Sequence, residues 1–108
     1  MAPRDFDAEI KALSQTLSGI EAVLDLDRMR RDLVDLEKQA SVPDLWDDPQ
    51  RAQQVTSKLS SVQADLRRVE ELRGRIDDLP IMVELAEEEG GDAFEEVAQE
   101  LDEVTRIV

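Results

Sequence analysis

The chain has 108 residues, enough for one modest domain, and its 27 acidic against 13 basic residues give a net charge of −14. Contact with nucleic-acid phosphates needs clustered Lys and Arg, so this charge argues against direct DNA or RNA binding and against docking on anionic membranes. The chain contains no Cys and no His, which excludes a disulfide framework, a thiolate zinc site and a Cys or His catalytic group.

Four segments carry apolar residues at alternating spacings of three and four positions, the pattern of a helix with one buried side. These patterns run from Phe6 to Leu24, from Leu26 to Ala40, from Ala52 to Leu79 and from Phe94 to Val108. The sequence therefore predicts an all-α fold. We expect an elongated antiparallel helical bundle with coiled-coil-like heptad seams, forming a single domain over residues 1–108.

Aspartates mark the starts of two of these helices. Asp25 or Asp27 is placed to cap the second helix, which makes a tight bend after the first. Asp48 followed by Pro49 predicts the start of the third, because the carboxylate accepts from unpaired backbone N–H groups and proline needs no donor at the first helical position.

Proline, glycine and aspartate residues predict the later helix boundaries. Pro80 lacks a backbone donor and is predicted to end or kink the third helix, with a shorter segment following it. Gly90 and Gly91 provide a stop after that segment. Asp92, with Glu95 three residues later, predicts a capping-box start for the last helix.

Trp46, the only Trp, lies in the connection before the third helix. An aromatic residue beside a helix start usually packs into the bundle and fixes the path of the connection, and this interpretation is favoured. The alternative is a binding hot spot, in which Trp is enriched.

Between Arg75 and Arg106 the chain has twelve acidic residues and no basic one. Charge runs of this kind usually form a solvated helix face, and this is the favoured interpretation. The alternative is a surface offered to a basic partner. Like-charge neighbours such as Glu100 and Glu103 are expected to repel each other by a few tenths of a kcal/mol.

The sequence offers little chemistry. Ser residues lie in no nucleophile pattern, and the one Gly pair lacks the features of a phosphate loop. The acidic tract from Glu87 to Asp92 fails the spacing of an EF-hand calcium loop. No catalytic, cofactor-binding or metal-binding residue is therefore predicted.

The order of the segments carries a family resemblance. Leu33–Ala40 is followed by the run Pro43–Gln53, which reads Pro-Asp-Leu-Trp-Asp-Asp-Pro-Gln-Arg-Ala-Gln, and then by Leu59–Val62, Glu84–Glu88 and Asp92. This order resembles the N-terminal domain of the bacterial peptide chain release factor 2 family of class I translation termination factors. The resemblance covers nearly all 108 residues, and its Pro-Asp-x-Trp-x-x-Pro-x-x-Ala-Gln core is fairly specific.

The resemblance implies a role in translation termination at UGA and UAA codons on the ribosome. The family's codon-reading Ser-Pro-Phe and catalytic Gly-Gly-Gln tripeptides do not occur in this chain, so the chain alone is not expected to be an enzyme. The family's N-terminal domain projects toward the ribosomal stalk base. An acidic surface that includes Glu88 and Glu96 is the candidate contact with basic components there.

Three further expectations concern the state of the chain. No apolar segment is long enough to be a signal or a membrane span, so we expect a cytoplasmic protein. The last helical pattern runs to Val108 without a stop, as in a fragment of a longer multidomain protein. Short connections favour helices that pair within one chain, and therefore a monomer.

The alternative from another functional class is a free-standing acidic helical adaptor or coiled-coil interaction protein. The apolar seams are compatible with pairing between chains. Light scattering separates the two, because a stable dimer at low micromolar concentration would favour the adaptor.

Overall fold

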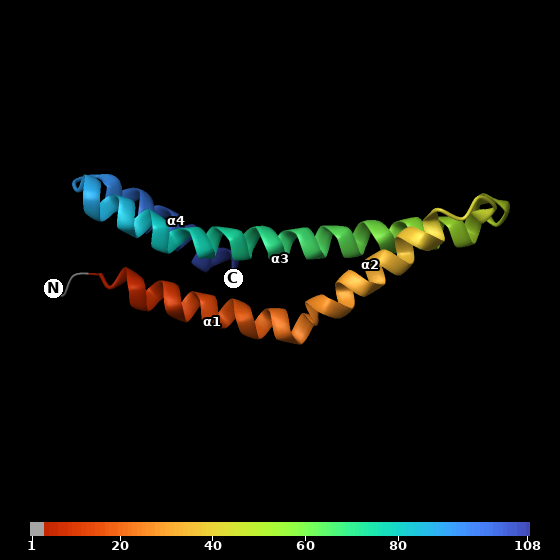
Figure 1. Ribbon diagram of the computed structural model, residues 1–108, viewed down its shortest axis with the longest axis horizontal. Helices are drawn as coiled ribbons and strands as arrows, with labels where there is room; N and C mark the ends of the chain where they lie inside the picture. The colour runs from red at the N-terminus through yellow and green to blue at the C-terminus, as the bar shows by residue number, and fades with distance from the viewer. Residues whose placement is uncertain (1–3) are drawn as a thin grey trace. The chain divides into compact units, whose positions relative to one another are not determined.

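The computed structural model describes residues 4–108, and these are arranged as four α-helices and one short 3₁₀ turn (Figure 1). The elements are α1 (Phe6–Leu24), α2 (Leu26–Ala40), η1 (Leu45–Asp47), α3 (Pro49–Glu89) and α4 (Ala93–Ile107). The described part of the chain contains no β-strand. The predicted all-α helical bundle with four helical segments is confirmed.

The contacts of the chain divide it into two compact units. Unit 1 consists of Met1–Ile20 and Glu70–Val108, and unit 2 consists of Glu21–Val69. Each unit has its own set of buried apolar side chains, and no polar or charged residue is buried among the described residues.

Unit 1 buries the apolar sides of the first part of α1, the second part of α3 and α4. The spacing of three and four positions along each helix is what places these side chains on one side. They are Ile10, Leu13, Leu17, Ile76, Leu79, Val83, Ala86, Val97, Leu101 and Val104. At the edge of this core the rings of Phe6 and Phe94 stack with their centroids 6.1 Å apart, which ties α1 to α4.

Of the two outcomes predicted at Pro80, an end of the third helix is wrong, because α3 stays helical through the proline to Glu89. Proline has no N–H to donate to the carbonyl of Ile76, so the helix loses one backbone hydrogen bond there. Ile76, Leu79 and Val83 on either side of the proline are buried. Their burial offsets the loss and keeps the chain helical.

Unit 2 is built on the pairing of α2 with the first part of α3, which the connection through η1 folds back against it (Figure 1). Its main buried cluster is small, and Leu66 is buried outside it, farther along α3. The buried members are Leu36, Leu45, Ala52 and Val55, with Ala40, Leu59 and Val62 packed against them in partly buried positions.

Two of the predicted helix caps are confirmed. The Asp25 carboxylate accepts a hydrogen bond from the Arg28 backbone N–H at 3.2 Å. The backbone of Asp25 takes the left-handed conformation, with φ at 54°, and this makes the tight bend between α1 and α2. Asp48 likewise accepts from the Arg51 N–H at 3.2 Å, immediately before Pro49 begins α3.

The capping box predicted from Asp92 and Glu95 is wrong. The Asp92 side chain makes no cap hydrogen bond, because its backbone already has helical angles, with φ −73° and ψ −7°. The turn between α3 and α4 is instead closed by its backbone. Gly90 and Gly91 adopt left-handed φ values of 70° and 59°, and the Gly90 N–H donates to the Ala86 carbonyl at 2.7 Å.

The favoured interpretation of Trp46 as a core anchor is also wrong. Trp46 is 64% exposed, and the neighbouring Leu45 is the buried residue of the connection, at 7% exposure. Consecutive side chains in a 3₁₀ turn point about 120° apart, since the turn has about three residues per revolution. Only one of the two can face the core, and Leu45 takes that place.

Candidate partner-binding surface

Arg75 on α3 forms ion pairs with two glutamates of α4 near the C-terminal end of the acidic stretch. Its guanidinium donates to Glu100 at 2.7 Å and lies 3.3 Å from Glu103. The arginine hydrogen bond lowers the pKa of the Glu100 carboxyl, and the two glutamates raise the pKa of Arg75. Glu100 and Glu103, expected to repel each other, thus share a cation in the fold.

Arg4 makes a second link of this kind, between the start of α1 and α4. Its guanidinium bonds Glu9 at 2.7 Å and Asp102 at 2.6 Å, and it lies 5.2 Å from the centre of the Phe6 ring. The hydrogen bond from Arg4 lowers the pKa of Asp102. A third arginine, Arg73, joins α3 to α1 by donating to the Ser14 hydroxyl at 2.8 Å. These contacts join the helices of unit 1 and are structural.

Replacing Glu100 with Gln is expected to remove a pH-dependent part of the stability. Because the pKa of Glu100 is lowered in the fold, its contribution is present above its ordinary value of 4.5 and is lost as the pH falls through and below that value. Arg75 and Glu100 are 35% and 25% exposed, so after allowance for solvent screening the loss at pH 7 is about 1 kcal/mol. Urea unfolding of Glu100→Gln and wild type from pH 7 to pH 3 measures it.

The curves of the two proteins should converge at the acid end of this series. Glu84→Gln is the matched control, because Glu84 is exposed on α3 and outside this ion pair. A stability difference that stays constant down to pH 3 would contradict the ion-pair explanation.

Glu88 and Glu96, the candidate partner contacts, are both exposed in unit 1. Glu88 lies near the end of α3, and Glu96 lies in the first turns of α4. Their exposure leaves both carboxylates accessible to solvent. The fold therefore places the two candidates on elements joined by the Gly90–Gly91 turn.

Two apolar residues near Glu88 escaped the sequence reasoning. Ile81 is 55% exposed and Leu85 is 52% exposed. With Glu88 they follow the spacing i, i+4, i+7, so the three side chains share one face of α3. The helical spacing of the sequence could have identified them as exposed, because they fall outside the buried series that includes Leu79 and Val83. We call Ile81, Leu85 and Glu88 the outer face of α3.

Within residues 4–108 no group of three or more carboxylates comes together in a way that could hold a metal ion. No helix in this part of the chain is long and apolar enough to cross a membrane.

Comparison with known proteins identifies the family. Residues 29–108 match the PCRF domain. The chain is 58% identical over 89 residues to peptide chain release factor 2 of Streptomyces avermitilis, covering 82% of this chain and 24% of that protein. It is 58% identical over 97 residues to peptide chain release factor 2 of Corynebacterium glutamicum, covering 87% of this chain and 26% of that protein.

A third relative aligns along the whole chain. Peptide chain release factor 2 of Pseudarthrobacter chlorophenolicus is 47% identical over 109 aligned positions, covering 100% of this chain and 29% of that protein. The chain thus spans about a quarter of the length of the curated relatives it matches. The resemblance drawn from Pro43–Gln53 is confirmed, and the chain belongs to the PCRF domain family, in the form carried by the N-terminal region of peptide chain release factor 2.

Proposed function

We propose that this chain is the N-terminal accessory domain of a release factor of the release factor 2 type, acting in translation termination at UGA and UAA codons. The observation that carries the proposal is its identity of 47% to 58% with proteins named peptide chain release factor 2, over most of its length. In this proposal the chain binds the ribosome and helps to position the factor there. Peptidyl-tRNA hydrolysis belongs to a Gly-Gly-Gln tripeptide in the remainder of such a factor.

The partner in this proposal is the stalk-base region of the ribosome. The outer face of α3 supports it, because Ile81 and Leu85 add apolar contact area beside the Glu88 carboxylate. Glu96 adds a second exposed negative charge on α4. A basic protein surface would be attracted by both charges during encounter and would cover the apolar pair once bound.

A chimeric factor tests the termination role. The matching region of the Corynebacterium glutamicum release factor 2 is replaced by this chain, and peptide release is measured on ribosomes with UGA in the A site. The rate should stay within about threefold of the parent factor, a change of under about 1 kcal/mol in the barrier. A folded chimera that binds ribosomes but releases at the rate of a factor lacking this region would contradict the role.

The acidic surface is tested in the same chimera by reversing both charges with Glu88→Lys and Glu96→Lys. The association rate constant with ribosomes should fall about fivefold at low salt, because complementary charge mainly speeds encounter. The difference should shrink as salt is raised, since screening removes it. Asp32→Lys with Asp35→Lys is the matched control, because it makes the same charge change at exposed positions of α2.

The two outcomes are distinguishable. Equal slowing in the control pair would mean that net charge alone acts, and unchanged association would remove Glu88 and Glu96 from the contact while leaving the termination role intact. In this proposal the chain is monomeric and works in the cytoplasm. Light scattering that finds a stable dimer at low micromolar concentration would instead favour a free-standing adaptor.

A further inference from the structure

A second surface lies in unit 2, at the connection between α2 and α3. Leu45 anchors this connection in the core, and Trp46 and Val42 are turned outward with 64% and 46% of their areas exposed. Large aromatic side chains dominate the energetics of interfaces, because they bury a great deal of apolar area with few rotatable bonds. The exposed Trp46 and Val42 of this connection are therefore candidate contact residues.

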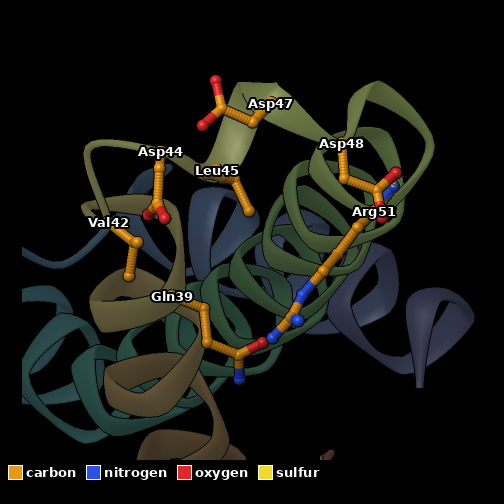
Figure 2. Close-up of a pocket in the computed structure, with 7 residues that line it drawn as sticks. All are labelled: Gln39, Val42, Asp44, Leu45, Asp47, Asp48 and Arg51. Carbon is orange, nitrogen blue, oxygen red and sulfur yellow. Dashed lines mark hydrogen bonds between the residues drawn. The ribbon is translucent and has the colours of Figure 1, made fainter.

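The same connection borders a surface cleft of about 420 Å³ (Figure 2). The walls come from the end of α2, from η1 and from the start of α3, so the cleft belongs wholly to unit 2. In Figure 2 the Leu45 side chain points into the middle of this group, and Arg51 extends from α3 toward Gln39. The lining residues are Gln39, Val42, Asp44, Leu45, Asp47, Asp48 and Arg51.

The charge of the rim is negative. Three aspartates and one arginine line the cleft, and Asp48 is already committed to capping α3. Asp44 and Asp47 are exposed, and Figure 2 shows the Asp47 carboxylate directed outward from η1. Phosphate groups would be repelled by this rim, which disfavours RNA as the occupant, whereas Lys or Arg side chains would be attracted.

We propose that this cleft, together with the exposed Trp46 of the same connection, binds a basic segment of a partner protein. An aliphatic or aromatic side chain of that segment packs against Trp46 and Val42 at the cleft, and its Lys or Arg side chains lie against Asp44 and Asp47. We call the cleft and Trp46 together the Trp46 surface. It goes beyond the proposed function, because it lies in unit 2 and includes neither the outer face of α3 nor Glu96.

Trp46 provides its own readout, since it is the only Trp of the chain. The whole 108-residue chain is titrated with a synthetic helical peptide that carries Leu along one side and Lys along the other. Binding should saturate and shift the Trp46 emission to shorter wavelength, as water leaves the indole. A peptide with the same lysines and Ala in place of Leu should bind about tenfold more weakly, the effect of losing an apolar anchor.

Variants locate the binding. Asp44→Asn with Asp47→Asn should weaken binding of the Leu–Lys peptide about fivefold, the effect of losing two exposed charge contacts. Asp32→Asn with Asp35→Asn changes the net charge equally on α2 and should leave the affinity within about twofold. By calorimetry, Trp46→Ala should weaken binding about tenfold, and Val34→Ala, at an exposed apolar position of α2 outside the cleft lining, should not.

Four results would overturn the proposal. The Ala–Lys peptide could bind as tightly as the Leu–Lys peptide, or both aspartate pairs could matter equally, and either result would make the binding a consequence of net charge. A ten-nucleotide uridine RNA that shifts the emission would assign the surface to nucleic acid. An emission that shifts with the concentration of the chain alone would mean that a second copy covers Trp46.

Discussion

Leu79→Ala is expected to lower the free energy of unfolding by about 3 kcal/mol, within the range for fully buried leucines. Leu79 has no exposed area, and it lies on α3 between the buried residues Ile76 and Val83. Removing its branched end leaves a cavity that these neighbours fill only in part. Urea unfolding followed by far-ultraviolet circular dichroism measures the change.

The matched control is Leu85→Ala, which truncates a leucine of the same helix that is 52% exposed and should change stability by less than about 0.5 kcal/mol. If Leu79→Ala does not fold, Leu79→Met keeps nearly the same volume and should cost about 1 kcal/mol. Equal losses at positions 79 and 85 would contradict the assignment of the buried side of α3.

Pro80→Ala is expected to act in the opposite direction, stabilising the chain by about 2 kcal/mol. A proline inside a helix costs about 3 kcal/mol relative to alanine, and alanine restores the N–H that can donate to the Ile76 carbonyl. The greater conformational entropy of alanine in the unfolded chain reduces this gain in stability by about 0.5 to 1 kcal/mol. The same urea series measures the gain.

Ile81→Ala, at the next and half-exposed position, is the control for a general effect of alanine in this turn of α3. A destabilised Pro80→Ala chain would mean that the shape Pro80 gives to α3 is needed to pack Leu79 and Val83. The prediction would then be wrong in sign, and the role of the proline would be to shape the helix for packing of the core.

The helices were predictable because their information is local. The buried series of α1, α3 and α4 follow the spacing of three and four, and the caps at Asp25 and Asp48 depend on residues only three positions away. The family resemblance was likewise carried by the order of short contiguous runs, of which Pro43–Gln53 is the most specific. Local patterns of this kind are read directly from a sequence.

The errors came where the outcome depends on packing or on the wider fold. Burial on both sides of Pro80 outweighs a local helix breaker, and nothing local decides whether Leu45 or Trp46 faces the core. Arg75 and Glu100 are 25 positions apart in the sequence. Neighbouring positions on one helix therefore predicted only repulsion between the glutamates of the acidic stretch. The exposed apolar residues Ile81 and Leu85 were missed for the same reason, since exposure is a property of the folded chain.

The Arg75 contact also bears on how this domain can change during evolution. Loss of the positive charge at position 75 would leave Glu100 and Glu103, three positions apart on α4, without the cation that they now share. A substitution there would be tolerated best in a lineage where one of those glutamates had already become neutral. A substitution at any one of these three positions therefore changes the effect that a substitution at the other two has on stability.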